Sequence, residues 1–126
     1  RFIPILIDSC LKKQVFKCSN GEQLRDFLYI DDLISVFFKA LNNTDIIHKI
    51  INVGTAKPKK LREIIKKVIQ IFKSVKPEYG VVKLRKDEAK IIYPKITSVK
   101  KLLKWKPKTN FNIGLMKTIK YYRMSK

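Results

Sequence analysis

Residues 23–32 read Gln-Leu-Arg-Asp-Phe-Leu-Tyr-Ile-Asp-Asp, and this stretch predicts a strand that runs directly into a helix. Apolar and aromatic side chains alternate over 24–30, which is the pattern of a strand. Asp31 can then cap a helix that runs over 32–41. Arg25 lies near the start of the strand, and its guanidinium has a planar fork of donors that pairs two oxygens of an anion at once. The stretch therefore predicts a strand–helix unit with an arginine on its strand.

Hydrophobic spacing predicts further helices and short strands on both sides of this unit. The helices are expected at 2–13, 61–73, 97–104 and 110–124, and the strands at 15–18, 50–53 and 79–84. The helix over 61–73 is the clearest, because its apolar residues form one stripe and its charged residues the other face. The helix over 32–41 is apolar nearly all the way round, which predicts burial on several sides. The pattern indicates an α/β fold over residues 1–126, with no internal repeat and no linker.

Length and composition narrow the class of protein. With 126 residues the chain is one domain or a piece of one, and its hydrophobic content of 45% is that of a globular protein. No apolar run approaches the roughly 18–20 residues that span a bilayer, so no membrane partner is expected. The chain begins at Arg1 without a methionine, which suggests a truncated or excised segment. Cys10 and Cys18 are expected to be reduced, buried thiols of a cytoplasmic protein.

The net charge of +19 leaves three explanations open. Lysines supply 24 of the 29 cations and are spread over every segment, a pattern that a lysine-rich proteome produces without any polyanion partner. General attraction of anionic nucleotides is the second explanation. Dedicated nucleic-acid binding is the third and is unlikely, because the charges do not cluster on one segment.

Several motifs occur in the order of a known family. After Arg25-Asp26-Phe27 with its double acid come Ile-Asn-Val-Gly-Thr at 51–55, Leu-Arg-Lys-Asp-Glu at 84–88 and Leu-Leu-Lys-Trp-Lys-Pro at 102–107. Together they resemble the nucleotide-sugar epimerases and dehydratases of the extended short-chain dehydrogenase/reductase family. The resemblance covers almost the whole chain. It implies the C-terminal, substrate-binding half of such an enzyme, helices with short strands, without the N-terminal Rossmann sheet.

The same resemblance assigns roles to individual residues. Arg25 grips the diphosphate of a nucleotide-diphosphate sugar, and Arg85 closes on the diphosphate or ribose from the other side. Glu88 matches an acid that accepts from ribose hydroxyls. The sequence departs from the family where Lys86-Asp87 replaces a Pro-Gly-like turn. The alternative for each of these charged residues is an ordinary exposed side chain.

Three further residues are candidates for substrate binding. Phe16 and Cys18 fall on the strand that borders the nucleobase in relatives, and alternation places both on one face. The composition of this strand favours core packing as the role of this pair. Asn52 belongs to the Ile-Asn-Val-Gly-Thr block, and satisfying the backbone at a strand end is its alternative role.

The chain does not carry the catalytic or cofactor motifs of the family. Tyr-x-x-x-Lys occurs at 79–83 and at 122–126, but the first lies in a predicted strand and the second at the chain end, so both are interpreted as chance matches. The four glycines, at 21, 54, 80 and 114, form no phosphate-binding loop, and no metal-ligand spacing occurs. NAD or NADP would therefore be bound by the absent half, with that half or a homodimer partner completing the enzyme. The alternative is a non-catalytic fragment or a small basic binding module.

Overall fold

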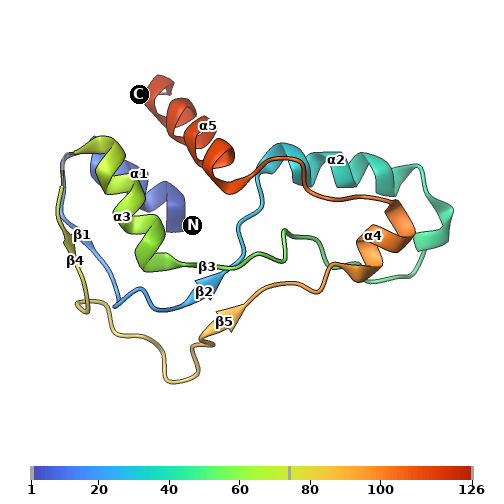
Figure 1. The fold of residues 1–126 in the computed structure, drawn as a ribbon, viewed down its shortest axis with the longest axis horizontal. Coiled ribbons are helices and arrows are strands. Elements are labelled where there is room, and N and C mark those ends of the chain that lie inside the picture. The colour runs from blue at the N-terminus through green and yellow to red at the C-terminus, as the bar shows by residue number, and fades with distance from the viewer. Residues whose placement is uncertain (1, 74, 126) are drawn as a thin grey trace.

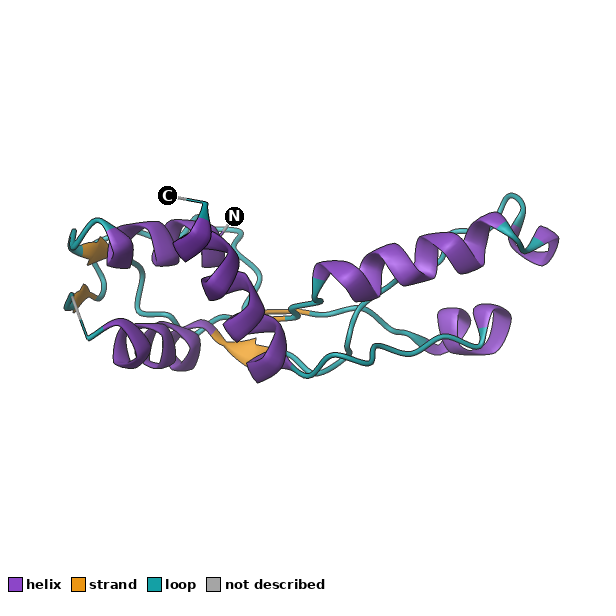
Figure 2. Cartoon of the chain, turned by 90° about the horizontal axis from the view of Figure 1, so that it is seen from above, coloured by secondary structure: helices purple, strands orange, loops and turns teal. Residues whose placement is uncertain are grey.

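The chain folds into two helical groups joined by a small sheet. The computed structural model describes residues 2–73 and 75–125. Three helices gather at one end, namely α1 (Phe2–Leu11), α3 (Leu61–Phe72) and α5 (Phe111–Met124) (Figure 1). At the other end lie α2 (Ile30–Leu41) and α4 (Thr97–Leu103), and the view from above shows the sheet between the two groups (Figure 2). The α/β class expected from the sequence is confirmed.

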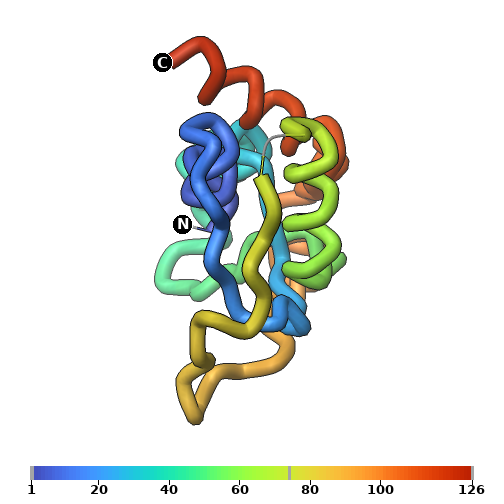
Figure 3. The backbone as a smooth tube through the Cα atoms, turned by 90° about the vertical axis from the view of Figure 1, so that its left-hand side faces the viewer, coloured from blue at the N-terminus to red at the C-terminus, as the bar shows by residue number. Residues whose placement is uncertain are grey.

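The sheet joins three segments that are far apart in the sequence. Its central strand β2 (Leu24–Arg25) pairs antiparallel with β3 (Lys59–Lys60) and parallel with β5 (Ile91–Ile92). A separate parallel pair, β1 (Phe16–Lys17) and β4 (Pro77–Glu78), runs side by side at the end of the molecule that carries α1 and α3 (Figure 3). The strands are short, and helix packing supplies most of the core.

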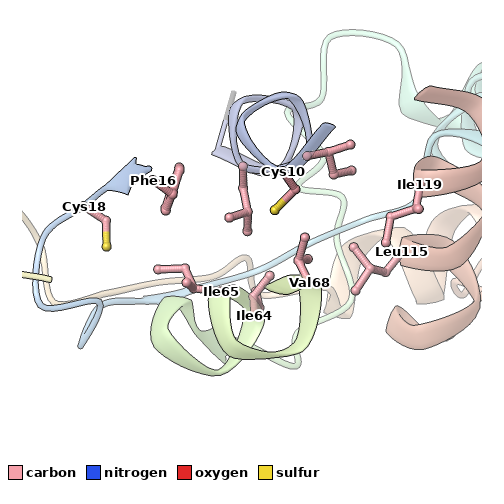
Figure 4. Packing of buried hydrophobic residues seen from close by; sticks show 10 residues of the cluster. Cys10, Phe16, Cys18, Ile64, Ile65, Val68, Leu115 and Ile119 are labelled. Carbon is pink, nitrogen blue, oxygen red and sulfur yellow. The ribbon is translucent and has the colours of Figure 1, made fainter. Parts of the chain in front are cut away.

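The larger core lies between α1, α3 and α5. The apolar stripe of α3 predicted from the sequence faces α1, so its buried side chains meet those of α1 and of β1 (Figure 4). The cluster consists of Leu6, Ile7, Cys10, Phe16, Cys18, Ile64, Ile65, Val68, Leu115 and Ile119. Burial of this much aliphatic surface is the main stabilising contribution at this end. Asn110 caps α5 by accepting a hydrogen bond from Ile113 N at 2.9 Å.

A smaller core lies between α2 and α4. Val36 of α2 packs with Val99 and Leu103 of α4 and with Trp105, whose indole N–H donates to Ser35 Oγ at 2.8 Å. The opposite face of α2 has no cover within the described residues. Its side chains are between 45% and 80% exposed, and they are Ile30, Ile34, Phe37, Phe38 and Leu41. The expectation that this helix is buried on several sides is therefore wrong for the described chain.

The strand–helix unit differs from its prediction at the junction. β2 ends at Arg25 instead of continuing to residue 30, because the Asp26 side chain bonds to the backbone of Thr55 and turns the chain away from the ladder. The helix begins at Ile30 with Tyr29 at its N-cap position, so the prediction that Asp31 caps it is wrong. Asp31 lies in the first turn, where a carboxylate is favourable to the helix dipole.

Two predicted strands do not form as predicted. Residues 50–53 are extended without a ladder, and Ile50 is 95% exposed. A strand is predicted at 79–84, but β4 ends at Glu78, and Gly80 then turns the chain with a φ of +80°. Both segments have the composition of strands, but residues 50–53 form no ladder in the described part of the chain. Within 79–84, Val82 N donates to Cys18 O at 3.2 Å without a ladder forming.

Both cysteines are buried and neither forms a disulfide, as expected. Burial raises the pKa of the Cys10 thiol, and it also raises the pKa of Cys18, where Arg62 partly offsets the effect. Among the described residues, no helix has both the length and the apolar character needed to cross a membrane.

We predict that the Asp32 side chain contributes substantially to the free energy of unfolding. Its carboxylate, 5% exposed, accepts from Lys108 N at 3.1 Å and from Thr109 N at 2.9 Å, so it fastens α2 to the segment before α5. Asp32→Ala leaves both N–H groups without that acceptor and should lower the free energy of unfolding by roughly 2–3 kcal/mol. Urea unfolding followed by circular dichroism measures the change. The control Asp31→Ala removes an exposed carboxylate and should cost under about 1 kcal/mol; equal losses would contradict the assignment.

Candidate functional site

Arg25 is held in a fixed position at the end of β2. Its Nη1 donates to the carbonyl oxygens of Leu24 at 2.9 Å and Lys90 at 3.4 Å, and its Nη2 bonds to a carboxylate oxygen of Glu88. The side chain is 19% exposed. Because the guanidinium is anchored by a carbonyl of β2 and by the carbonyl that directly precedes β5, it loses little conformational entropy when an anion binds.

An open groove of about 490 Å³ lies beside Arg25. One wall is formed by β2 and the residues after it, another by residues 52–54, and the third by the end of β5 and the residues that follow. The lining residues are Arg25, Asp26, Leu28, Asn52, Val53, Gly54, Ile92, Tyr93, Pro94 and Lys95. Arg25 and Lys95 give this groove two cationic side chains, and Tyr93 adds an aromatic ring.

Asp26 closes the groove at its base and is already engaged. Its Oδ2 accepts from Thr55 N at 2.6 Å, and its Oδ1 accepts from the Thr55 hydroxyl and from Lys57 N at 3.4 Å. A Cβ on Gly54 would lie 2.2 Å from Pro94 Cγ and 2.3 Å from Asp26 Oδ2, so only glycine fits here. These neutral donors stabilise the Asp26 carboxylate without removing its charge, so the groove is lined by one carboxylate and by the two cations Arg25 and Lys95.

Arg85 lies next to the groove instead of lining it. It begins a turn that Glu88 N closes by donating to Arg85 O at 3.1 Å, so Lys86-Asp87 supports a turn despite its departure from the family pattern. Glu88, the fourth residue of that turn, reaches Arg25 with its side chain. The turn belongs to an exposed segment between β4 and β5 that loops out from the body (Figure 1).

The other predicted residues divide between groove and core. Asn52 is exposed and lines the groove with Arg25. Phe16 and Cys18 are 6% and 7% exposed and pack in the larger core, the role that the sequence favoured for them (Figure 4). Their contact with a nucleobase stays a prediction.

The sequence-based prediction of the site missed the residues that shape the groove around Arg25. Asp26 and Gly54 lie in the same motifs as Arg25 and Asn52, and that proximity in the sequence is the available signal for them. Tyr93 and Lys95 had no signal, because β5 itself was not predicted.

The first tyrosine–lysine match is confirmed not to lie on a helix. Tyr79 follows β4, and its ring lies under the Arg62 guanidinium at 4.0 Å. Burial raises the pKa of Tyr79, although Arg62 partly offsets this, whereas a catalytic phenol needs a lowered value. The second match ends at Lys126, which lies outside the described residues. No cluster of metal-ligating side chains occurs among the residues that the structure describes.

Comparison with known proteins agrees with the motifs. Residues 1–54 match the sequence model of the NAD dependent epimerase/dehydratase family. A UDP-glucuronate 4-epimerase from Thermodesulfobacterium geofontis is 33% identical over 123 residues, and CDP-abequose synthase from Salmonella typhimurium is 27% identical over 129 residues. The chain belongs to the NAD-dependent epimerase/dehydratase family. The matches cover 96% and 95% of this chain but 36% and 42% of the two relatives.

Solved structures of this family share the fold. A UDP-glucose 4-epimerase from Thermotoga maritima, solved with UDP-glucose, superposes with a TM-score of 0.87 at 25% identity, over 98% of this chain and 39% of its own. The Bordetella bronchiseptica enzyme WbmG, solved with NAD and UDP, has a TM-score of 0.82 at 19% identity over 99% of this chain and 40% of its own. The fold described above is therefore that of one part of these larger family members.

Gly54 provides a test of the groove's base. Gly54→Ala would drive a methyl group into Pro94 and the Asp26 carboxylate, so it should lower the free energy of unfolding by about 1–3 kcal/mol. Chemical denaturation measures it. Asn52→Ala, at an exposed position in the same wall, should stay within about 0.5 kcal/mol of the wild type. A Gly54→Ala variant as stable as Asn52→Ala would show that this close approach does not exist.

Proposed function

We propose that this chain is the substrate-binding portion of a nucleotide-sugar epimerase, dehydratase or 4-keto reductase, in which Arg25 and Arg85 hold the substrate's diphosphate. The observation that carries the proposal is the Arg25 guanidinium, anchored by two backbone carbonyls at the edge of an open groove. A diphosphate presents paired oxygens to which such a fork can bond bidentately. Lys95 adds a second cation to the same groove.

Arg85 is placed to act from the adjoining turn. The Arg85 carbonyl accepts a hydrogen bond from Glu88 N, and the Glu88 side chain bonds to Arg25. Arg85 therefore belongs to the same turn as the residue that contacts Arg25. The Arg85 side chain is exposed, so it can move toward a bound anion at little packing cost. Glu88 and Asn52 would then face the ribose and sugar side of the ligand, and Tyr93 has an exposed ring suited to stacking.

The names of relatives and neighbours support the substrate class. The proteins similar to this chain include a synthase named for a CDP-sugar and an epimerase named for a UDP-sugar, and solved neighbours hold UDP-glucose or UDP. All of these molecules share a nucleoside diphosphate, and this shared chemistry is what two arginines recognise.

NAD or NADP would be bound outside this chain. The four glycines are too scattered to form the glycine-rich turn that cradles a dinucleotide pyrophosphate, and the described strands form no doubly wound parallel sheet. The residues present do not fit a dinucleotide. The chain's own contribution is therefore to bind and orient the sugar nucleotide.

The exposed face of α2 is the proposed contact with a cofactor-binding half. Its apolar stripe, defined above as Ile30, Ile34, Phe37, Phe38 and Leu41, is a contiguous set of large apolar side chains that are 45–80% exposed, and such patches mark interaction surfaces. The extended segment 50–53 lies in the same part of the chain with its backbone outside any ladder, and Ile50 is nearly fully exposed. A neighbouring sheet would cover the stripe and pair with this segment, and the relatives have the extra length to provide one.

The diphosphate clamp predicts a loss of nucleotide affinity on mutation. Arg25→Ala removes a charge-assisted bidentate contact and should weaken binding of UDP-, dTDP-, CDP- or GDP-sugars by about 10–100-fold, with Arg85→Ala losing less. Isothermal titration calorimetry with the four ligand classes measures the change and identifies the base. Arg123→Ala is the matched control, because its guanidinium stacks on Phe72 at 4.7 Å in the helical end. Unchanged affinity in Arg25→Ala would remove the clamp.

If a cofactor-binding half covers the exposed face of α2, a cysteine placed on that face should be protected from thiol-reactive reagents. Phe37→Cys should react with a maleimide at the rate of an exposed thiol in the 126-residue chain, since Cys10 and Cys18 are buried. In a fusion to the cofactor-binding half of the Thermodesulfobacterium geofontis relative, the rate should fall at least about tenfold. Lys101→Cys on the exposed surface of α4 is the control and should label equally in both proteins. Equal labelling of Phe37→Cys in both proteins would contradict the proposed contact.

A further inference from the structure

The guanidinium proposed to bind the diphosphate already has an anion bound to it. Nη2 of Arg25 bonds to the Glu88 carboxylate, while Nη1 is held by the Leu24 and Lys90 carbonyls. The two side chains are 19% and 32% exposed, so the pair is partly shielded from water. The Glu88 carboxylate therefore occupies Nη2 of Arg25, one of the N–H groups to which a ligand phosphate would bind.

Glu88 sits on a segment that can move without disturbing the core. Every residue from 81 to 90 is exposed. Backbone hydrogen bonds anchor the segment at its two ends, from Val82 N to Cys18 O at 3.2 Å and from Leu24 N to Lys90 O at 2.8 Å. Between these anchors, the turn that joins Arg85 to Glu88 is held to the sheet by the Glu88 side chain.

We propose that Glu88 is an internal competitor for the anion site: its carboxylate occupies Arg25 when the groove is empty, and a diphosphate must displace it. This inference rests on the proposed function of Arg25. Displacement exchanges one negative charge for the two of a nucleotide-sugar diphosphate or the roughly three of pyrophosphate. Inorganic phosphate has between about one and two charges at neutral pH and only one phosphorus centre, so it competes less well than pyrophosphate. Release of Glu88 also frees the turn, which lets Arg85 approach the same phosphate groups.

The competitor is tested with Glu88→Gln, which keeps the shape of the side chain and removes its charge. Inorganic pyrophosphate is the main probe, because it has no ribose for Glu88 to contact. Glu88→Gln should bind pyrophosphate about 3–10-fold more tightly than the wild type, and the gain for inorganic phosphate should be smaller. The matched control is Glu22→Gln, which removes the carboxylate that pairs with Lys60 at 2.9 Å, and it should leave pyrophosphate affinity unchanged.

A double variant separates this proposal from the clamp itself. If Glu88 acts through Arg25, the gain disappears in Arg25→Ala/Glu88→Gln. Pyrophosphate affinity that is unchanged or lower in Glu88→Gln would overturn the proposal. If pyrophosphate affinity falls in Arg25→Ala, the proposal that Arg25 binds the diphosphate still stands. If Arg25→Ala leaves that affinity unchanged, both the diphosphate-binding role of Arg25 and the competitor role of Glu88 are contradicted.

Discussion

The bonds between Asp26 and Thr55 are the constraint on which the rest of the structure depends. Asp26 directly follows β2, and Thr55 follows the extended segment that leads out of the smaller core, so their contact fastens one helical group to the sheet. Asp26 and Pro94 can approach the backbone this closely because Gly54 has no side chain. The contact between Asp26 and Thr55 holds the segment after Arg25 against the segment after Asn52, and so it places both residues in one groove.

The same constraint sets the electrostatics of the groove. The two acidic groups beside it are both engaged, Asp26 by backbone and hydroxyl donors and Glu88 by Arg25. On the proposed function, the many lysines would act as a general positive field that attracts nucleotides without choosing among them. The selectivity of the proposed site therefore comes from the geometry of one arginine and from the charge that a ligand needs to displace Glu88.

The helices could be predicted from the sequence, because a local pattern of apolar residues determines them. The bounds of the strands could not, because a strand forms only where a neighbouring segment pairs with it. The apolar stripes of α3 and α5 are local signals, and both helices formed within one residue of their predicted bounds. Residues 50–53 and 79–84 have strand composition, but a strand also needs a neighbour, and no pattern in the sequence shows which neighbour is present. Arg25 and Asn52 were found through motifs. Lys95 and Tyr93 were missed because they reach the groove through β5, a two-residue strand that periodicity cannot detect.

The most direct test of the account is nuclear magnetic resonance of the arginine side chains during titration with UDP. The five arginines give distinguishable Nε–H signals once assigned by substitution. The account predicts that the Arg25 signal shifts with saturable dependence on UDP and that the Arg123 signal, from a guanidinium stacked on Phe72, does not move. Saturable binding that shifts other signals and leaves Arg25 unchanged would contradict the central claim.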